Sequence, residues 1–432
     1  MPVPILVALL ATTINLPGGP PVGMDFLVYD RATNRVWVPA GNTGNVDIID
    51  VATGKVTPLG GFATAPPRKP GRPRMGPSSA AVGDGVVWIG NRANNQLLGF
   101  DARTLAPMAT VQLDAMPDGL AYVPRTHELW ATTPRDQSIK VVAVSGKVPG
   151  PVSSIKLEGE PECYAVDETH GAFYTNLEDK DRTLTIDTTT RKVVASWPSG
   201  CGAEGPRGLA LDGGRRLLFV ACTDGAGVFD LAHGGKALGR IKTGGGVDTL
   251  EYDPRARRLF VAAGQDGTLT IARVTDGGAL EVEATVPTAK GARNPVADAH
   301  GTVYVADSQG GQLLVVNPDA LAAGAVAMAV AMKEEQPGLL ARAKITPDAA
   351  TASARAKLPQ ARLVAAEIEQ EHGKLIYSFD FKTEGRSGSD EVAVDALTGK
   401  ILSVAHETPK DEAKEKGADA KAAATKAASR SH

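Results

Sequence analysis

Three stretches of the chain share one pattern: DGLAYVPRTHELWATT (118–133), RGLALDGGRRLLFVACTD (207–224) and DTLEYDPRARRLFVAAGQ (248–265). Each begins with an alternating apolar run, turns on polar residues, and enters a second apolar run containing an aromatic residue followed by small ones. A third run closed by Asp follows in other copies, as in LLGFDARTL (97–105) and LTIDTTT (184–190). The pattern predicts strand, hairpin, strand, hairpin, strand.

The aromatic residue of this pattern recurs at near-constant spacing. It is Trp37, Trp88, Trp130, Tyr174, Phe219, Phe260 and Tyr304, in steps of 51, 42, 44, 45, 41 and 44 residues. A period of about 40–45 residues is typical of propeller blades, each a four-stranded sheet. Seven copies predict a mainly β protein, a seven-bladed β-propeller over residues 1–318.

A fourth, outer strand precedes each new blade, as ATVQL (109–113) precedes the third. The segment ATTINL (Ala11–Leu16) stands in the same relation to the first blade, whereas the seventh blade has no outer strand after Val316. We therefore expect the N-terminal strand to complete the seventh blade, which leaves no open sheet edge.

The character of the chain changes after Pro318. We expect an Ala-rich connector over 319–338 and a small α+β domain over 339–408, in which Thr346 caps a helix with Pro347 at its first position. The helix precedes three alternating segments, ARLVAAEIEQ (361–370), KLIYSFDFK (374–382) and DEVAVDALTGKILSVAHE (390–407). The Lys/Ala-rich remainder, 409–432, is predicted to be a disordered tail.

Composition limits the classes of partner and the compartment. The net charge of −3 argues against a nucleic-acid-binding face, and no run reaches the ~18 apolar residues of a membrane span. We expect a monomer. Cys201 and Cys222 fall close together in blade five and are predicted to form a disulfide, which suits an oxidising compartment, while Cys163 is interpreted as a buried small hydrophobe. PILVALLA (Pro4–Ala11) fits either early strand or the end of a secretion signal that starts before Met1.

One set of charged residues recurs at a single position of the repeat. Counting twelve residues back from the aromatic reaches the start of the innermost strand, at the mouth of the central channel. These positions are Asp25, Asp118, Glu162, Arg207 and Asp248, with Arg293 eleven residues before Tyr304 and Ser78 as the equivalent in blade two. Two interpretations stay open: an ion-pair ring that closes the channel, or a ligand site. Because four acids face two arginines, Asp25, Asp118, Glu162 and Asp248 could hold a cation such as Ca²⁺, and no other cofactor is expected.

Two loop features belong to the same face. The insertion TAPPRKPGRPRMGP (64–77) carries Arg68, Lys69, Arg72 and Arg74 and is either an extended loop or a basic lid over the mouth. The loops between second and third strands are strongly polar and include Arg92. No nucleophile elbow, phosphate loop or HExxH motif is present, so no catalytic residue is assigned.

Two resemblances follow from these motifs. RVWVPAGNTGNVDIIDVATGK (35–55) and TVYVADSQGGQLLVVNP (302–318) resemble the YVTN-type (YncE-like) propeller repeat. ITPDAA (345–350), KLIYSFDF (374–381) and VDALTGKIL (394–402) resemble the PepSY domain. The second resemblance implies an extracytoplasmic location, periplasmic or secreted, and a protein-binding or peptidase-inhibiting role.

We therefore expect an extracytoplasmic propeller that binds a small ligand or a protein, or acts as a scaffold. We expect it to be a binding protein rather than an enzyme. One alternative is a Ca²⁺-dependent propeller enzyme, such as a lactonase or lyase, that uses the acidic ring. Calcium-dependent lactonases on propeller folds also place acids at this mouth, an analogy of fold alone. The other alternative is a peptidase regulator that acts through the PepSY-like domain.

Overall fold

The computed structural model describes residues 11–67, 71, 73–145, 148–319, 332–355, 357–358, 361–371, 373–383 and 387–407. The chain divides into two compact units, residues 1–319 and 320–432. The predictions for Pro4–Leu10, for most of the connector and for the tail after Glu407 concern residues outside these ranges. Within the described ranges, no helix combines the length and the apolar character needed to cross a membrane.

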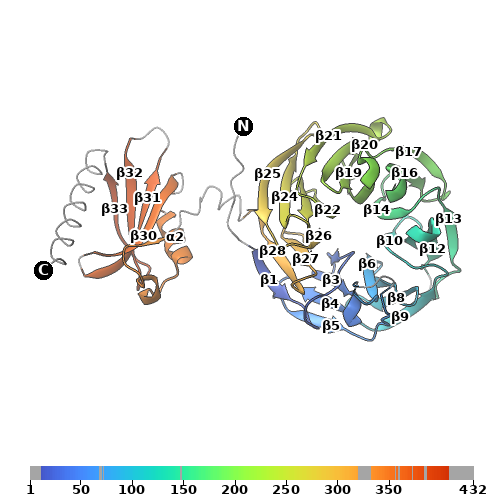
Figure 1. The fold of residues 1–432 in the computed structure, drawn as a ribbon, viewed down its shortest axis with the longest axis horizontal. Helices are drawn as coiled ribbons and strands as arrows, with labels where there is room; N and C mark the ends of the chain where they lie inside the picture. The colour runs from blue at the N-terminus through green and yellow to red at the C-terminus, as the bar shows by residue number, and fades with distance from the viewer. Residues whose placement is uncertain are drawn as a thin grey trace. The chain divides into compact units, whose positions relative to one another are not determined.

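The first unit consists of seven four-stranded antiparallel sheets arranged as blades around a channel (Figure 1). Blades one to three contain β2–β5 (Val28–Asp30, Arg35–Ala40, Asn45–Asp50, Val56–Leu59), β6–β9 (Pro77–Gly83, Val86–Asn91, Gln96–Asp101, Pro107–Gln112) and β10–β13 (Leu120–Val123, Glu128–Thr133, Ser138–Ala143, Ser153–Lys156). Blades four to six contain β14–β17 (Pro161–Asp167, Ala172–Leu177, Arg182–Asp187, Val193–Pro198), β18–β21 (Pro206–Asp212, Leu217–Cys222, Gly225–Asp230, Lys236–Lys242) and β22–β25 (Val247–Asp253, Arg258–Ala263, Thr268–Val274, Leu280–Pro287).

The seventh blade is assembled from both ends of the propeller sequence. It contains β26 (Ala292–Ala297), β27 (Val303–Asp307), β28 (Gln312–Val316) and, as its outer strand, β1 (Ala11–Asn15). β1 pairs antiparallel with β28, from Ala11 opposite Val316 to Asn15 opposite Gln312. The prediction that the N-terminal strand closes the ring is confirmed.

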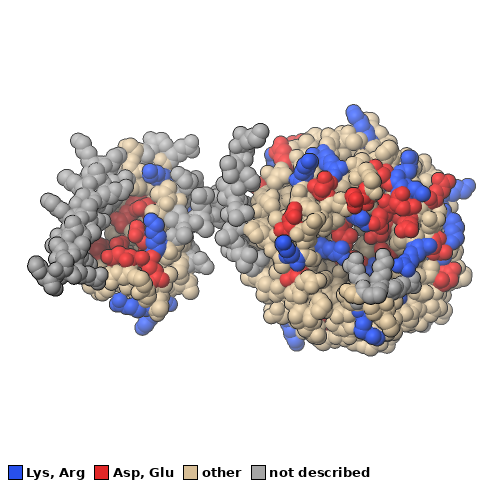
Figure 2. Space-filling view, in the orientation of Figure 1, with Lys and Arg blue, Asp and Glu red and all other residues tan. Residues whose placement is uncertain are grey.

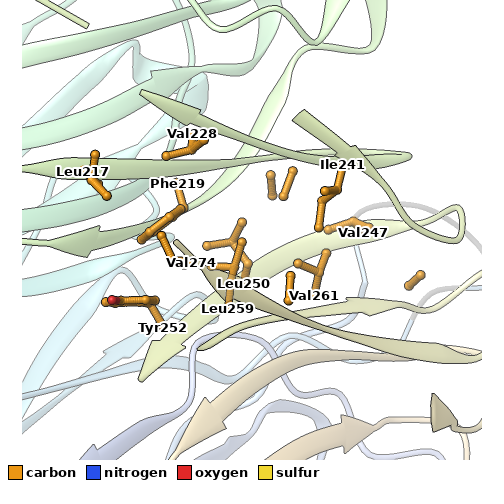
Figure 3. Close-up of a cluster of buried hydrophobic side chains, with 14 residues drawn as sticks. Leu217, Phe219, Val228, Ile241, Val247, Leu250, Tyr252, Leu259, Val261 and Val274 are labelled. Atoms are coloured by element: carbon orange, nitrogen blue, oxygen red, sulfur yellow. The ribbon is translucent and has the colours of Figure 1, made fainter. Parts of the chain in front are cut away.

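Six of the seven repeated aromatic residues, those other than Phe260, belong to buried clusters shared by neighbouring blades. All seven lie in the second strand of their blades and are at most 4% exposed. Figure 3 shows one such interface, where Phe219 of blade five packs against Tyr252 of blade six with ring centroids 4.8 Å apart. Large aromatic side chains bury the most apolar area per residue. The repeated aromatic residue therefore provides a buried contact between neighbouring blades in six of the seven repeats.

The second unit is a five-stranded sheet with one helix. The sheet order is β29 (Lys333–Glu334), β30 (Arg362–Glu371), β31 (Lys374–Lys382), β32 (Ser389–Asp395) and β33 (Ile401–Glu407). Helix α2 (Pro347–Arg355) contacts β31 and β32. As predicted, Thr346 caps the helix, because its Oγ1 accepts a hydrogen bond from the Ala349 amide at 3.3 Å.

The three cysteines all lie in blades four and five. Cys201, in the turn before β18, is joined by a disulfide to Cys222, the last residue of β19. Cys163 is a buried free thiol, and burial raises its pKa to about 12. The thiol therefore has the character of a small apolar side chain rather than of a nucleophile.

Candidate functional site at the channel mouth

The charged residues predicted from the repeat start the innermost strands. Ser78, Glu162, Arg207, Asp248 and Arg293 are each the second residue of their strand: β6, β14, β18, β22 and β26. In four of these strands the pairing with the next strand shifts register at this residue, and in β26 it shifts directly after it, at Asn294. A bulge changes the direction of side chains at a strand end, so the side chains at these equivalent positions can point toward the channel.

Asp25 and Asp118 precede β2 and β10 instead of lying inside them. The Asp118 amide donates to the carbonyl oxygen of Thr132 at 2.8 Å, so the residue is fixed by the neighbouring strand although it lies before β10. In the space-filling view, acidic and basic side chains gather around the hollow at the centre of the propeller (Figure 2).

The guanidinium that joins the two carboxylates comes from Arg92, in the loop between β7 and β8. Its Nη2 donates to Asp25 Oδ2 at 2.7 Å and also to Asp118 Oδ1. Burial and the two carboxylates act on this group in opposite directions, and the net effect is a raised pKa. Counting from the aromatic residues missed Arg92, because its position depends on a loop and not on the strand repeat.

A second ion pair joins blades six and seven, where Arg293 Nη1 is 3.0 Å from Asp248 Oδ2. The neighbouring Asn294 donates through Nδ2 to Asp25 Oδ1 at 3.2 Å, which connects blade seven to blade one. We name Asp25, Arg92, Asp118, Glu162, Asp248 and Arg293 together the mouth cluster.

Arg207 differs from the prediction that it belongs to the ring of ion pairs. Its guanidinium pairs with Glu178, from the short helical turn that follows β15, and also donates to the Glu204 carbonyl oxygen at 3.3 Å. Arg207 is not part of the ring of ion pairs because the Glu178 carboxylate, which lies outside that ring, is close enough to bind its guanidinium. Arg207 still lowers the pKa of Asp248 through its charge, although the net shift of that pKa is upward because of burial.

Glu162 is the carboxylate of the mouth cluster without a cation of its own. Among the residues that the structure describes, its side chain makes no ion pair and no hydrogen bond. Burial, followed by the charges of Asp118, Asp248 and Asp25, raises its pKa to about 9, and burial raises that of Asp118 to about 6. The cluster therefore carries a proton on Glu162 at neutral pH.

The geometry does not fit the Ca²⁺ site expected as one interpretation of the four acids. Within the described ranges no group of three or more Asp, Glu, His or Cys side chains converges closely enough to hold a metal ion. Arg92 binds Asp25 and Asp118 together, and a guanidinium satisfies carboxylate oxygens that a calcium ion would need.

A cavity of about 540 Å³ opens beside the mouth cluster, and we name it the mouth cavity. Its lining includes Asp25, Arg92 and Arg293 from the cluster, together with Ser78, Ser308, Gln265, Gln309 and Arg74. Arg74 belongs to the basic insertion, and its Nη2 donates to Thr64 Oγ1 at 3.0 Å. Arg68, Lys69 and Arg72, the other basic residues of the predicted lid, lie outside the described residues.

Among the described residues, the histidines provide no catalytic or metal-binding alternative at this face. His127, His170 and His300 lie in turns between first and second strands. His170 Nδ1, for example, is 2.8 Å from Asp167 Oδ2 within its own turn.

Comparison with known proteins identifies the second unit and the fold of the first. Residues 344–405 match the family model for the peptidase propeptide and YPEB domain, PepSY. The second unit is a PepSY domain. No curated protein matches the chain.

Among solved structures, three comparisons are informative. The chain is similar to a chain of the mitotic checkpoint complex (14% identity, 70% of this chain and 90% of that one, TM-score 0.58). It is similar to the Myceliophteria thermophila Cps50 (Swd1) β-propeller domain (12%, 71% and 98%, TM-score 0.56). It is also similar to a catalytically inactive virginiamycin B lyase from Staphylococcus aureus with quinupristin (13%, 71% and 99%, TM-score 0.56). At these identities the similarity establishes a shared propeller fold and nothing about the ligand.

Proposed function

We propose that this protein is an extracytoplasmic binding protein of the YVTN-like propeller type, which takes a small polar ligand at the channel mouth and carries PepSY as an accessory domain. The observation that carries the proposal is a cavity of about 540 Å³ that opens beside a buried, charged cluster. Ligand sites are concave and combine a few well-placed polar groups with a largely preformed wall.

The charge count supports a ligand more than a self-contained structural ring. In the mouth cluster the carboxylates of Asp25, Asp118 and Asp248 face the guanidiniums of Arg92 and Arg293, and Glu162 keeps its proton at neutral pH, which leaves one carboxylate charge in excess. A ring whose role is to close the channel needs charge balance, because an unpaired buried charge costs stability. Excess charge and perturbed pKa values in a cleft are features of binding sites.

The extracytoplasmic location rests on two independent observations. Cys201 and Cys222 form a disulfide, and disulfides persist in oxidising compartments. The PepSY match extends over residues 344–405, and that domain is typical of proteins outside the cytoplasm.

The test is a thermal-shift screen of small polar compounds with the full-length protein and two variants. Gln309→Trp fills the mouth cavity from an exposed residue of its lining, and Lys236→Trp places the same side chain on the outer strand β21 as a control. We expect compounds that raise the melting temperature of wild type and Lys236→Trp but not of Gln309→Trp. A screen with no stabilising compound, or with equal stabilisation of all three proteins, contradicts the proposal.

A second candidate function, regulation of a peptidase, is favoured by the PepSY match and by one feature of the sheet. β33 is an edge strand, and its Leu402 and Val404 side chains are 40% and 50% exposed. Apolar side chains on an unpaired edge favour the addition of an extended segment from a partner. We expect the full-length protein to inhibit a secreted peptidase and Leu402→Asp/Val404→Asp to lose this inhibition. Equal inhibition by both proteins, or none by wild type across a panel of secreted peptidases, contradicts this role.

The calcium-dependent enzyme expected as an alternative is not proposed, because the carboxylates at the mouth do not form a calcium ligand set.

A further inference from the structure

We infer that the mouth cavity recognises an oxyanionic group, a carboxylate or a phosphate, on a small polar molecule, and that Arg293 and Arg74 bind this group. The inference rests on the proposed function and names the ligand class of the same site. It follows from the charges that line the cavity, from their unused hydrogen-bond donors and from the state of the backbone around them.

The lining of the cavity is basic although the mouth as a whole is acidic. Three guanidiniums, Arg74, Arg92 and Arg293, line it together with one carboxylate, Asp25. Arg92 binds Asp25 Oδ2 and Asn294 binds Oδ1, so both oxygens of this carboxylate are occupied. Glu162 is not a lining residue. Within the described part of the chain, Arg92 and Arg293 are paired with carboxylates and Arg74 is not, so a cation in the cavity would face at least one uncompensated guanidinium, whereas an anion would be attracted to it.

Arg293 and Arg74 retain donors for a ligand. Arg293 pairs with Asp248 through Nη1, and no other hydrogen bond of its guanidinium to a described residue is formed. Arg74 uses Nε and Nη2 for Thr64, at 3.4 and 3.0 Å, and keeps Nη1. A guanidinium offers five N–H donors in a fixed fork that matches carboxylate and phosphate oxygens. The contacts with Thr64 and Asp248 hold the two forks in place before a ligand arrives.

The backbone of the cavity wall leaves recognition to side chains. Six glycines line the cavity, and the amides of all but Gly76 donate hydrogen bonds to other described residues: Gly41, for example, donates to Gly23 O at 2.8 Å, and Gly291 donates to Gly264 O at 2.6 Å. A Cβ at Gly76 would overlap the Gly41 carbonyl oxygen, so the wall owes its close packing to glycine. Because five of these six glycine amides already donate within the protein, they do not form an anion-binding nest, and the arginine side chains are the main groups that can bind an anion.

Two exposed and uncharged amide side chains complete the lining. Gln265 and Gln309 line the cavity and make no side-chain hydrogen bond with a residue of the described ranges. A primary amide can both donate and accept, which suits hydroxyl or amide groups on the uncharged part of the ligand. The ligand class is therefore a small polar molecule that carries an oxyanionic group.

The experiment is isothermal titration calorimetry on the full-length protein at low ionic strength, with succinate and inorganic phosphate as probes and succinamide as the neutral comparator. We expect wild type to bind at least one anion and not succinamide, and the affinity to fall as salt is added. Succinate without phosphate binding assigns a carboxylate, and the reverse result assigns a phosphate.

The decisive variant is Arg74→Gln. Arg74 pairs with no carboxylate of the described residues, so its removal leaves no buried charge without a partner. We expect this variant and Arg293→Gln to bind the anion at least about tenfold more weakly. Arg240→Gln, which removes an exposed pair with Asp224 on the outer strand β21, should bind as wild type does. Melting curves establish that each variant is folded.

The outcomes separate this inference from the proposed function. If neither anion binds wild type, or if Arg74→Gln and Arg293→Gln bind as tightly as Arg240→Gln, the inference is wrong. If neutral or cationic compounds then bind and Gln309→Trp abolishes their binding, the proposed function still holds with a different ligand class. If no compound of any class binds, both are wrong.

Discussion

Replacing Arg92 with Met tests whether the centre of the mouth cluster stabilises the propeller. The Arg92 side chain is 24% exposed, and its partners Asp25 and Asp118 are 19% and 11% exposed. Two unit charges 4 Å apart interact by about 4 kcal/mol at an effective dielectric constant near 20. Removing one partner of a buried pair costs about 3–5 kcal/mol, because the other charge remains buried. We expect a loss of this size in the unfolding free energy at pH 7.5.

The same substitution predicts a dependence on pH with a defined sign. Burial already raises the Asp118 pKa to about 6 in the folded state, and loss of Arg92, whose charge lowers that pKa, raises it further. A raised carboxyl pKa destabilises the folded state at pH values above it, and the penalty disappears as pH falls through it. The difference between Arg92→Met and wild type should therefore be smaller at pH 5 than at pH 7.5, by about 1–3 kcal/mol.

The assay is urea denaturation of wild type, Arg92→Met and the control Arg257→Met at both pH values. Arg257 pairs with Asp276 on the surface, where both side chains are more than half exposed, so its removal should cost about 1 kcal/mol or less. The reasoning is refuted if Arg92→Met lies within about 0.5 kcal/mol of Arg257→Met at pH 7.5, or if its deficit grows on acidification.

Three further predictions concern other parts of the molecule. Because burial raises the Glu162 pKa to about 9, the unfolding free energy of wild type should fall as pH rises from about 5 to 9, by up to about 1.4 kcal/mol per pH unit. Glu162→Gln should flatten this slope in denaturation curves measured across pH, and equal slopes for the two proteins would exclude the raised pKa. Replacing Cys201 and Cys222 together with Ser should lower unfolding free energy by about 3 kcal/mol, since the bond closes a separation of 21 residues; three titratable thiols in unreduced, denatured protein would show that the bond does not form. Deleting residues 1–16 should lower the melting temperature of the propeller, because β28 loses its outer partner and buried Leu16 is removed, and an unchanged midpoint would contradict this role of β1.

The fold could be predicted from the sequence because the repeat encodes it twice. Each blade interface needs a large aromatic residue such as Phe219, and each strand pair needs alternation, so both signals recur with one period. The closing strand was predictable for the same reason, since ATTINL matches the outer strands of other blades.

The candidate site could be predicted only where it depends on strand positions. Glu162 and Asp248 begin strands, so the repeat located them. Arg92 comes from a loop, and neither its direction nor its contact with Asp118 is encoded in strand periodicity. Arg207 could be placed at the right strand position, but the loop carboxylate of Glu178 that binds it could not be chosen from the many polar loop residues.

The pairing of β1 with β28 has a mechanical consequence. Ala11, where β1 begins, lies opposite Val316, where β28 ends, so the chain enters and leaves the propeller at the same end of one strand pair. Tension between the segment before Ala11 and the segment after Val316 therefore acts on one hydrogen bond at a time and peels the strands apart, instead of shearing all of them together. The β1–β28 pair removes an open sheet edge from the ring. The same pair is expected to separate at a lower force than strands that are sheared, when the two ends of the propeller segment are pulled apart.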